Sequence, residues 1–424
     1  MTTSALRREI VAVSPTRRVV MGALFLVLAV AIYWLFARVT PGDQITAFAL
    51  TPGGSRTAAL PNWLLPARTT LYVLAVLSAV LGGIQLARGF GRATNWILAV
   101  VVGLFIFGFL VWAAAGKSLN LAGMLGSTLL RSVPLTLGAL SGVLCERAGV
   151  VNIAIEGMML AGAMVGCLVG SVTHNLWVGL LGAIVAGALL GLLHGVLSIK
   201  YKASQIVSGT VINIFATGLT SYISAKFLQV YQELNNPGMF PRWEIPGLSS
   251  IPILGPILFD NNLFVYAMFA LLFVIQMALF STRWGLRMRS VGEHPKAADT
   301  LGINVFRTRY MAVLLGGMMA GFAGGYFTLG SVGRFDEVMT AGRGFISLAA
   351  MIFGNWTPFG SFGAGLLFGF ADSVAIKLSI LGVQIPAQFL GMAPYVATMI
   401  VLAGVVGRGH MPAADGTAYE KEEL

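Results

Sequence analysis

The sequence predicts an all-α, polytopic integral membrane protein with about 10 to 12 transmembrane or half-membrane helices. Hydrophobic residues make up 57% of its 424 residues, charged residues make up 10%, and the mean hydropathy is +0.84. A soluble domain, by contrast, carries about a quarter charged residues. Apolar runs that could cross about 30 Å of hydrocarbon, at about 1.5 Å per residue, also recur along the chain.

The apolar runs that are long enough to span a bilayer are residues 19–36, 71–87, 96–115, 148–172, 177–199, 206–228, 263–280 and 311–329. Shorter or interrupted candidates lie at residues 133–145, 345–353, 362–376 and 389–406. Residues 1–117 show no counterpart later in the chain, so we predict that they form an extra three-span unit. Residues 411–424 form a polar C-terminal tail.

Basic residues predict the orientation of the chain. They precede the first run, follow residue 199 and crowd residues 281–309, whereas residues 229–262 carry one arginine against three acidic residues. The positive-inside rule therefore places the N-terminus in the cytoplasm and the chain in the plasma membrane. Arg38, Arg56 and Arg68, on the predicted outer side, weigh mildly against this orientation. Because the basic residues lie in short connections, the net charge of +11 does not indicate nucleic-acid binding.

Glycines at four-residue steps predict close packing between helices. The three groups are Gly162, Gly166 and Gly170; Gly187, Gly191 and Gly195; and Gly317, Gly321 and Gly325. Lipid tails give helices little hydrophobic reason to associate, so small residues that let backbones approach are a main source of packing energy. We expect these glycines to pack helices together.

Two polar runs interrupt apolar stretches, which indicates a weak internal repeat with discontinuous helices. The first covers residues 146–157 and the second residues 354–360, and a glycine-spaced apolar stretch follows each. Paired breaks of this kind are typical of transporters built from repeats, with the substrate site nearby. Asn355, in the second break, is therefore a candidate residue of the translocation path.

Asn152 and Glu156, in the first break, lie four residues apart and share one face of a helix. A charge within a spanning segment costs several kcal/mol unless it faces a cavity or a partner, so both are candidates for the path. The alternative is that Glu146 and Arg147 pair at the membrane edge and that Asn152 caps the next helix.

Polar and small residues between Gln205 and Ser224 recur at steps of three and four, which places them on one stripe of a helix. Such a stripe must meet water, substrate or another polar helix, so Gln205 and Asn213 are further path candidates. Interhelical hydrogen bonds alone would explain the stripe equally well.

The basic connection 281–309 contains a predicted short helix. Pro295 suits its first turn, Glu293 lies where the helix dipole favours a negative charge, and Gly302 suits its end. Such a helix could dock into another protein. A lipid-headgroup anchor would explain the basic composition equally well.

The sequence shows no energy source of its own. It has no Gly-x4-Gly-Lys-Ser/Thr phosphate loop, no His-Glu-x-x-His motif, and no metal-ligand spacing among its four histidines and two cysteines. We therefore expect a chain that is not an enzyme and binds neither a metal nor a cofactor.

Three ordered blocks of sequence resemble one protein family. The first block comprises Ser132-Val133-Pro134-Leu135, Glu146-Arg147-Ala148-Gly149-Val150-Val151-Asn152-Ile153 and Glu156-Gly157-Met158-Met159; the others are residues 292–303 and 342–354. The chain resembles the permease subunits of bacterial ABC importers in the branched-chain amino acid, ribose and nucleoside permease family. The first block is most similar to purine-nucleoside and simple-sugar importers. The resemblance covers about residues 120–408, and the N-terminal unit departs from typical members.

The resemblance implies a permease core over residues 118–410 that forms the path for a nucleoside, with a purine nucleoside favoured over ribose or another simple sugar. It implies a second homologous permease, a cytoplasmic ATPase that uses ATP, and a lipid-anchored or periplasmic substrate-binding protein at a bacterial plasma membrane. It also makes residues 281–309 the loop that couples to the ATPase. The implied contacts in this loop are Glu293, Pro295, Ala297, Ala298 and Gly302.

Two other classes of protein stay open. A self-sufficient ion-coupled carrier would need carboxylates at mid-membrane, for which Glu156 and Asp372 are the plausible groups. A non-transporting scaffold would leave the polar breaks unexplained and would tolerate the substitution Glu156→Ala.

Overall fold

The computed structural model describes residues 15–53, 60–383, 389, 392 and 410–421. These residues form two compact units. The first unit is built mainly from residues 15–53 and 60–122, with residues 377–383. The second is built mainly from Gly123–Ile376, with the C-terminal residues 410–421.

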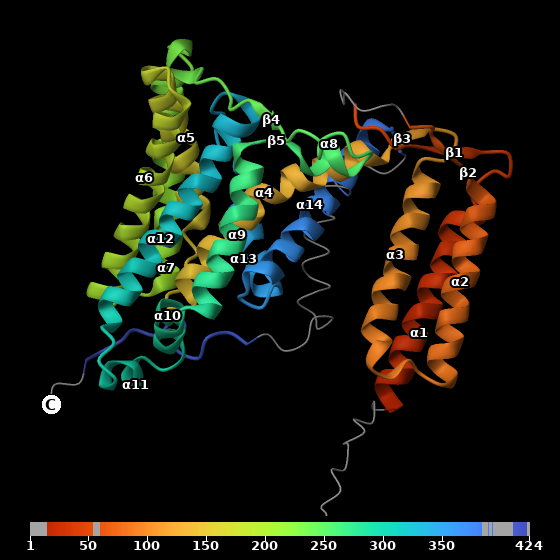
Figure 1. Ribbon diagram of the computed structural model, residues 1–424, viewed down its shortest axis with the longest axis horizontal. Coiled ribbons are helices and arrows are strands. Elements are labelled where there is room, and N and C mark those ends of the chain that lie inside the picture. Colours follow the sequence, from red (N-terminus) through yellow and green to blue (C-terminus); the bar gives the residue numbers. More distant parts are fainter. Residues whose placement is uncertain (1–14, 54–59, 384–388, 390–391, 393–409, 422–424) are drawn as a thin grey trace, which may run out of the picture. The chain divides into compact units, whose positions relative to one another are not determined.

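Ten helices of the described part are long and apolar enough to cross a membrane, which confirms the predicted polytopic all-α class (Figure 1). The spans are α1 (Pro15–Ala31) with η1 (Ile32–Ala37), α2 (Ala67–Ala87), α3 (Thr94–Ala113) preceded by η2 (Gly91–Ala93), α4 (Leu121–Glu146), α5 (Ile155–Thr173), α6 (Leu176–Gly195) with η3 (Val196–Lys200), α7 (Gln205–Ile223) with η4 (Ser224–Leu228), α9 (Leu263–Ser281), α12 (Val305–Gly325) with η6 (Tyr326–Val332), and α14 (Pro358–Ile380).

The other elements are short. They are β1 (Ile45–Ala49), β2 (Trp63–Pro66), β3 (Ser118–Asn120), η5 (Gln232–Asn235), β4 (Arg242–Glu244), α8 (Leu254–Leu258), β5 (Asp260–Asn262), α10 (Arg283–Glu293), α11 (Pro295–Thr300) and α13 (Arg343–Phe353). The small sheets lie in connections between spans, so they leave the helical class unchanged.

The first unit packs α1, α2 and α3 together and joins their ends with a small sheet of order β2-β1-β3. Strand β1 pairs antiparallel with β2 and parallel with β3. A Cβ added at Gly22 would lie 2.6 Å from the Leu86 side chain, so the absence of a side chain lets α1 and α2 approach closely. Phe36 lies against the rings of Phe105, Phe109 and Trp112 and fills the space between α1 and α3.

Two predicted runs in the second unit have different boundaries in the structure. The candidate 133–145 is part of α4, a continuous 26-residue helix that contains Pro134. The run 148–172 begins too early, because α5 starts only at Ile155 and Gly149 adopts φ +81°, a conformation that ends a helix. The candidates 345–353 and 362–376 fall within α13 and α14, whereas 389–406 lies largely outside the described residues.

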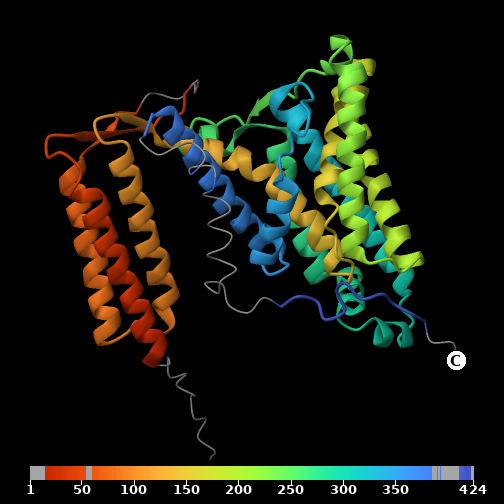
Figure 2. The ribbon, with the colours of Figure 1, turned by 180° about the vertical axis from the view of Figure 1, so that it is seen from behind.

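Glycines bring α6, α12 and α5 into backbone contact. A Cβ added at Gly187 would lie 2.3 Å from the Gly317 carbonyl oxygen, and one added at Gly162 would lie 2.7 Å from the Gly321 carbonyl oxygen. Gly191 faces Gly317 in the same way, and Gly166 faces Gly179 and Ala183. These three helices lie side by side in both ribbon views (Figures 1 and 2).

The two polar breaks lie against each other. Glu146, at the end of α4, accepts a hydrogen bond from the indole nitrogen of Trp356. The guanidinium of Arg147 donates to the carbonyl oxygens of Trp356, at 2.8 Å, and Asn355, at 3.2 Å. Each break thus supplies hydrogen-bond partners for the other, as backbone groups that leave a helix within a membrane protein require.

Candidate functional site

Glu156 joins two helices at the first break. It lies in the first turn of α5 and is buried. Its carboxylate accepts hydrogen bonds from the Thr340 hydroxyl at 2.6 Å and from the backbone N–H groups of Gly342, at 2.9 Å, and Gly344. These donors stand at the start of α13, so Glu156 caps a helix to which it does not belong. A negative charge is favourable there because the N-terminus of a helix carries a partial positive charge.

Asn213, on α7, also bridges to the first break. Its side-chain oxygen accepts from the Gly157 N–H at 2.7 Å, and its side-chain nitrogen donates to the Ile153 carbonyl at 2.9 Å. A Cβ added at Gly157 would lie 2.9 Å from the Asn213 backbone, so the two helices are in close contact. Asn213 therefore satisfies backbone groups that the interrupted helix leaves open.

The other path candidates make contacts of the same kind. The Gln205 side chain accepts from the Val151 N–H at 2.7 Å, and Asn152 accepts from the Ala154 N–H at 3.1 Å. Asn355 accepts from the His410 N–H at 2.7 Å through its side chain and from Arg147 through its carbonyl. The structure thus brings all five candidates to the two breaks, where they bind the backbone. None of them lines the three cavities described below, and their contact with substrate stays a prediction.

A cavity of about 470 Å³ lies between α4, η6 and the connection to α13, and we call it the aromatic–arginine cavity. The lining residues that could bind a solute are Ser127, Arg131, Tyr326, Phe327, Ser331 and Arg343. The Arg343 guanidinium lies 5.6 Å from the centre of the Phe327 ring. Arg131 is paired with Asp372 at 2.6 Å, so this carboxylate is already engaged. The volume falls within the range of about 300–1,000 Å³ that small-molecule sites occupy.

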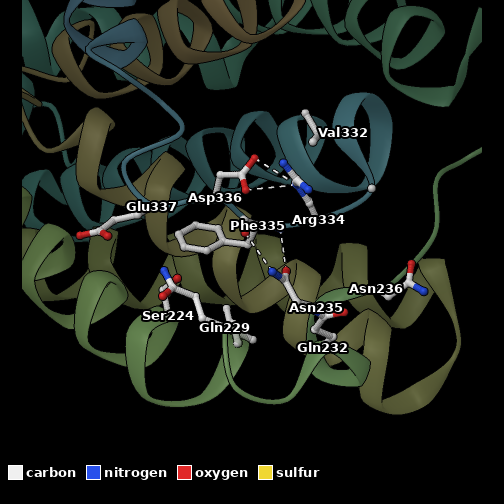
Figure 3. A pocket seen from close by; sticks show the side chains of 12 residues that line it. Ser224, Gln229, Gln232, Asn235, Asn236, Val332, Arg334, Phe335, Asp336 and Glu337 are labelled. Atoms are coloured by element: carbon white, nitrogen blue, oxygen red, sulfur yellow. Dashed lines mark hydrogen bonds and ion pairs between the residues drawn. The ribbon is translucent and has the colours of Figure 1, made fainter.

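A second cavity, of about 610 Å³, adjoins the first, and we call it the carboxamide cavity (Figure 3). Its polar lining residues are Ser224, Gln229, Gln232, Asn235, Asn236, Arg334, Asp336 and Glu337. Asn235 holds two distant segments together here, because it accepts from the Phe335 N–H at 2.7 Å and donates to the Phe335 carbonyl at 3.0 Å. Val332 and Asp336 line both cavities.

Sequence reasoning missed both cavities. The available signal was the cluster of carboxamides at residues 229–236 together with the charged run 334–337. Neither cluster alone indicates a site. The carboxamide cavity arises only when residues about 100 positions apart meet at the end of α7, as Figure 3 shows for Asn235 and Phe335.

The loop predicted to couple to an ATPase forms two helices, α10 and α11, at one end of the second unit (Figure 1). We call this the basic end, after the arginines and lysines of residues 281–309. Pro295 is the first residue of α11, and Gly302, just beyond its end, adopts φ +81°. Within this loop Ala298 is the buried residue of α11, whereas Glu293 and Ala297 are exposed. The exposed side of α11 is thus left open, and its contact with an ATPase stays a prediction.

The described residues contain no group of three histidine, cysteine, aspartate or glutamate side chains that could hold a metal ion. Cys145 and Cys167 are both free thiols and both buried.

Comparison of the sequence with known proteins identifies its family. The family described as branched-chain amino acid transport system / permease component matches residues 124–406. The guanosine ABC transporter permease protein NupQ of Bacillus subtilis is 42% identical over 309 residues, which cover 70% of this chain and 95% of the relative. The nucleoside ABC transporter permease protein NupC of Lactococcus lactis is 40% identical, with coverage of 71% and 97%.

A third relative is the putative glucose ABC transporter permease protein TsgC13 of Haloferax volcanii. It is 32% identical over 328 residues, which cover 71% of this chain and 98% of the relative. No solved structure matches the chain. The family match covers more than half of the chain, and the chain belongs to the branched-chain amino acid transport system permease family as a membrane-spanning permease component.

Proposed function

We propose that this chain is the permease subunit of an ATP-driven importer for a nucleoside, with guanosine as the first substrate to test. The observation that carries the proposal is the 42% identity to a guanosine permease over 95% of that relative's length. A cytoplasmic ATPase, a second homologous permease and an extracellular lipid-anchored or periplasmic substrate-binding protein complete the machinery. The basic end with α10 and α11 faces the cytoplasm, as does the N-terminus of a chain in the bacterial plasma membrane.

The aromatic–arginine cavity supplies chemistry that suits a nucleoside. A purine base offers a flat π-surface, and the planar guanidinium of Arg343, held over the Phe327 ring, can stack on it. The adjoining carboxamide cavity offers donors and acceptors for ribose hydroxyls. The two cavities adjoin, because Val332 and Asp336 line both of them.

The test is uptake of radiolabelled guanosine by proteoliposomes that contain the two permeases, the ATPase and the binding protein. The variant Arg343→Lys keeps the charge but loses the planar stacking surface, so we expect its KM to rise about tenfold, equivalent to about 1.4 kcal/mol. Arg242→Lys, at an exposed position outside both cavities, is the matched control and should keep the wild-type KM.

Two outcomes would contradict the proposed function, and a third would contradict the proposed site. Uptake of ribose or glucose in place of guanosine would overturn the substrate. Accumulation driven by an ion gradient in vesicles without the ATPase would identify an ion-coupled carrier. An unchanged KM in Arg343→Lys would remove the aromatic–arginine cavity from the path.

A further inference from the structure

The C-terminal segment, residues 410–421, returns to the basic end and binds the loop that carries α10 and α11 (Figure 2). The Ala414 N–H donates to the Gly292 carbonyl at 2.9 Å, and the Ala413 N–H donates to the Glu293 carboxylate at 3.2 Å. Gly292 and Glu293 form the end of α10, directly before α11. The segment therefore holds the point at which the two helices of the loop are joined.

Tyr419 packs the segment against three helices. Its side chain is 6% exposed and packs in one cluster with Val291 of α10, Ala298 of α11 and Val305 of α12. Its ring centre lies 5.3 Å from that of Phe306. A buried aromatic ring of this kind contributes substantial apolar burial, so α11 is held in place by the C-terminal segment as well as by its own loop.

The same segment also contacts both polar breaks. The Asp415 carboxyl is buried against Glu146, at the end of α4, and near Arg309. Arg309 donates to the Thr417 carbonyl at 2.8 Å. The His410 N–H donates to the Asn355 side chain in the second break at 2.7 Å. One stretch of chain thus links the coupling loop to the two places where the spans are interrupted.

Together, the segment and the loop enclose a groove of about 560 Å³. One wall consists of Lys296, Asp299 and Gly302 with Phe306, and the other contains Glu420 and Lys421. Leu301, at the end of α11, is 80% exposed although it lies outside every span. A large apolar side chain beside a groove of mixed charge is typical of a protein interface, with an apolar contact and a polar rim.

We propose that the C-terminal segment forms the second wall of the surface that receives the ATPase, so that the partner seats on α11 and on residues 416–421 together. This inference rests on the proposed function, because it takes the ATPase as the occupant of the groove. Movement of the seated partner would reach the breaks by two routes, through the α10–α11 loop and through the C-terminal segment. Tyr419 acts as a positioning residue for α11.

The first test is photo-crosslinking in the complete complex, with benzoylphenylalanine placed singly at Ala418, at Ala297 or at Leu181. Ala418 is an exposed residue of the C-terminal segment and Ala297 an exposed residue of α11, each beside residues that line the groove, and Leu181 is exposed on the apolar face of α6 as the control. We expect ATPase adducts from Ala418 and Ala297 and none from Leu181. Adducts from Ala297 without any from Ala418 would overturn this inference and leave the proposed function standing. Adducts from neither would overturn both.

The second test compares Tyr419→Ala with Tyr419→Phe. The alanine variant loses the ring that supports α11, and we expect at least a tenfold drop in ATPase retained on the purified permease and in ATP-driven uptake. The phenylalanine variant keeps the ring and should retain at least half of both. If the permease pair itself stays assembled in Tyr419→Ala while ATPase retention and uptake equal those of the wild type, the inference is wrong.

Discussion

Replacing Glu156 by alanine removes the acceptor shared by three donors at the start of α13. The donors are the Thr340 hydroxyl and the N–H groups of Gly342 and Gly344. A Cβ added at Gly344 would lie 2.5 Å from the Glu156 backbone, so α13 cannot move closer to fill the space. The Thr340 and Gly344 donors would remain buried without a partner, and the Gly342 donor would remain half-buried.

Each buried donor that loses its acceptor lowers the free energy of unfolding by about 1–3 kcal/mol. Three donors give about 3–9 kcal/mol, and water entering the vacated space moves the result toward the lower end. Proteins are stable by about 5–15 kcal/mol, so even the lower value is a large fraction of the total. Glu156→Gln keeps one acceptor oxygen and should therefore lie between the wild type and Glu156→Ala.

The structure supplies its own reporter for the measurement. Cys145 and Cys167 are free and buried, so a fluorogenic maleimide reacts with them only when the protein unfolds. We expect the apparent unfolding midpoint of Glu156→Ala in detergent to fall by about 5 °C or more. Glu233→Ala, at an exposed position on η5, is the control and should leave the midpoint unchanged. A Glu156→Ala midpoint equal to that of the wild type would refute the assignment of Glu156 as the cap of α13.

Two further predictions use the same assay, and a third follows unfolding by tryptophan fluorescence, because a maleimide reacts with the thiolate and is too slow at about pH 4 to 6. Gly187→Ala should prevent α6 and α12 from packing and yield little folded protein, whereas Gly218→Ala, where a Cβ meets nothing within 4 Å, should behave as the wild type; equal yields would contradict the packing argument. Asn213→Leu should lower the midpoint more than Asn213→Asp, which keeps the acceptor for Gly157; a normal midpoint with lost uptake would instead place Asn213 in the path. Burial raises the pKa of Asp415 to about 6, so the folded state holds this proton longer than the unfolded state and stability should fall, by up to about 3 kcal/mol, as the pH rises from about 4 to about 6. Asp415→Asn does not titrate and should lose this pH dependence; an equally steep decline in the variant would show that another group causes it.

The membrane-spanning architecture could be predicted from the sequence because hydropathy and helical spacing are local properties. The runs that became α6 with η3, α7 with η4, and α9 lie within one residue of their predicted limits, whereas α12 begins six residues before the predicted run 311–329. Pro295 and Gly302 bound α11 in the structure. Errors arose where local signals conflict. Because Arg131 and Pro134 interrupt the apolar pattern, the sequence predicted only a short run where the structure has the continuous helix α4. The helix is nevertheless buried, and Arg131 is paired with Asp372.

The composition and order of residues determined that this chain is a multi-pass permease component, because the length of each apolar run and the order of the motifs depend only on residues that are close in sequence. Only the tertiary structure decided what its polar residues do. Glu156 meets donors 184 to 188 positions away, Asn235 meets Phe335 100 positions away, and the C-terminal segment packs against α11. Most of these contacts join a side chain to backbone groups, which every residue possesses, so the sequence carries no mark of which partner each side chain finds.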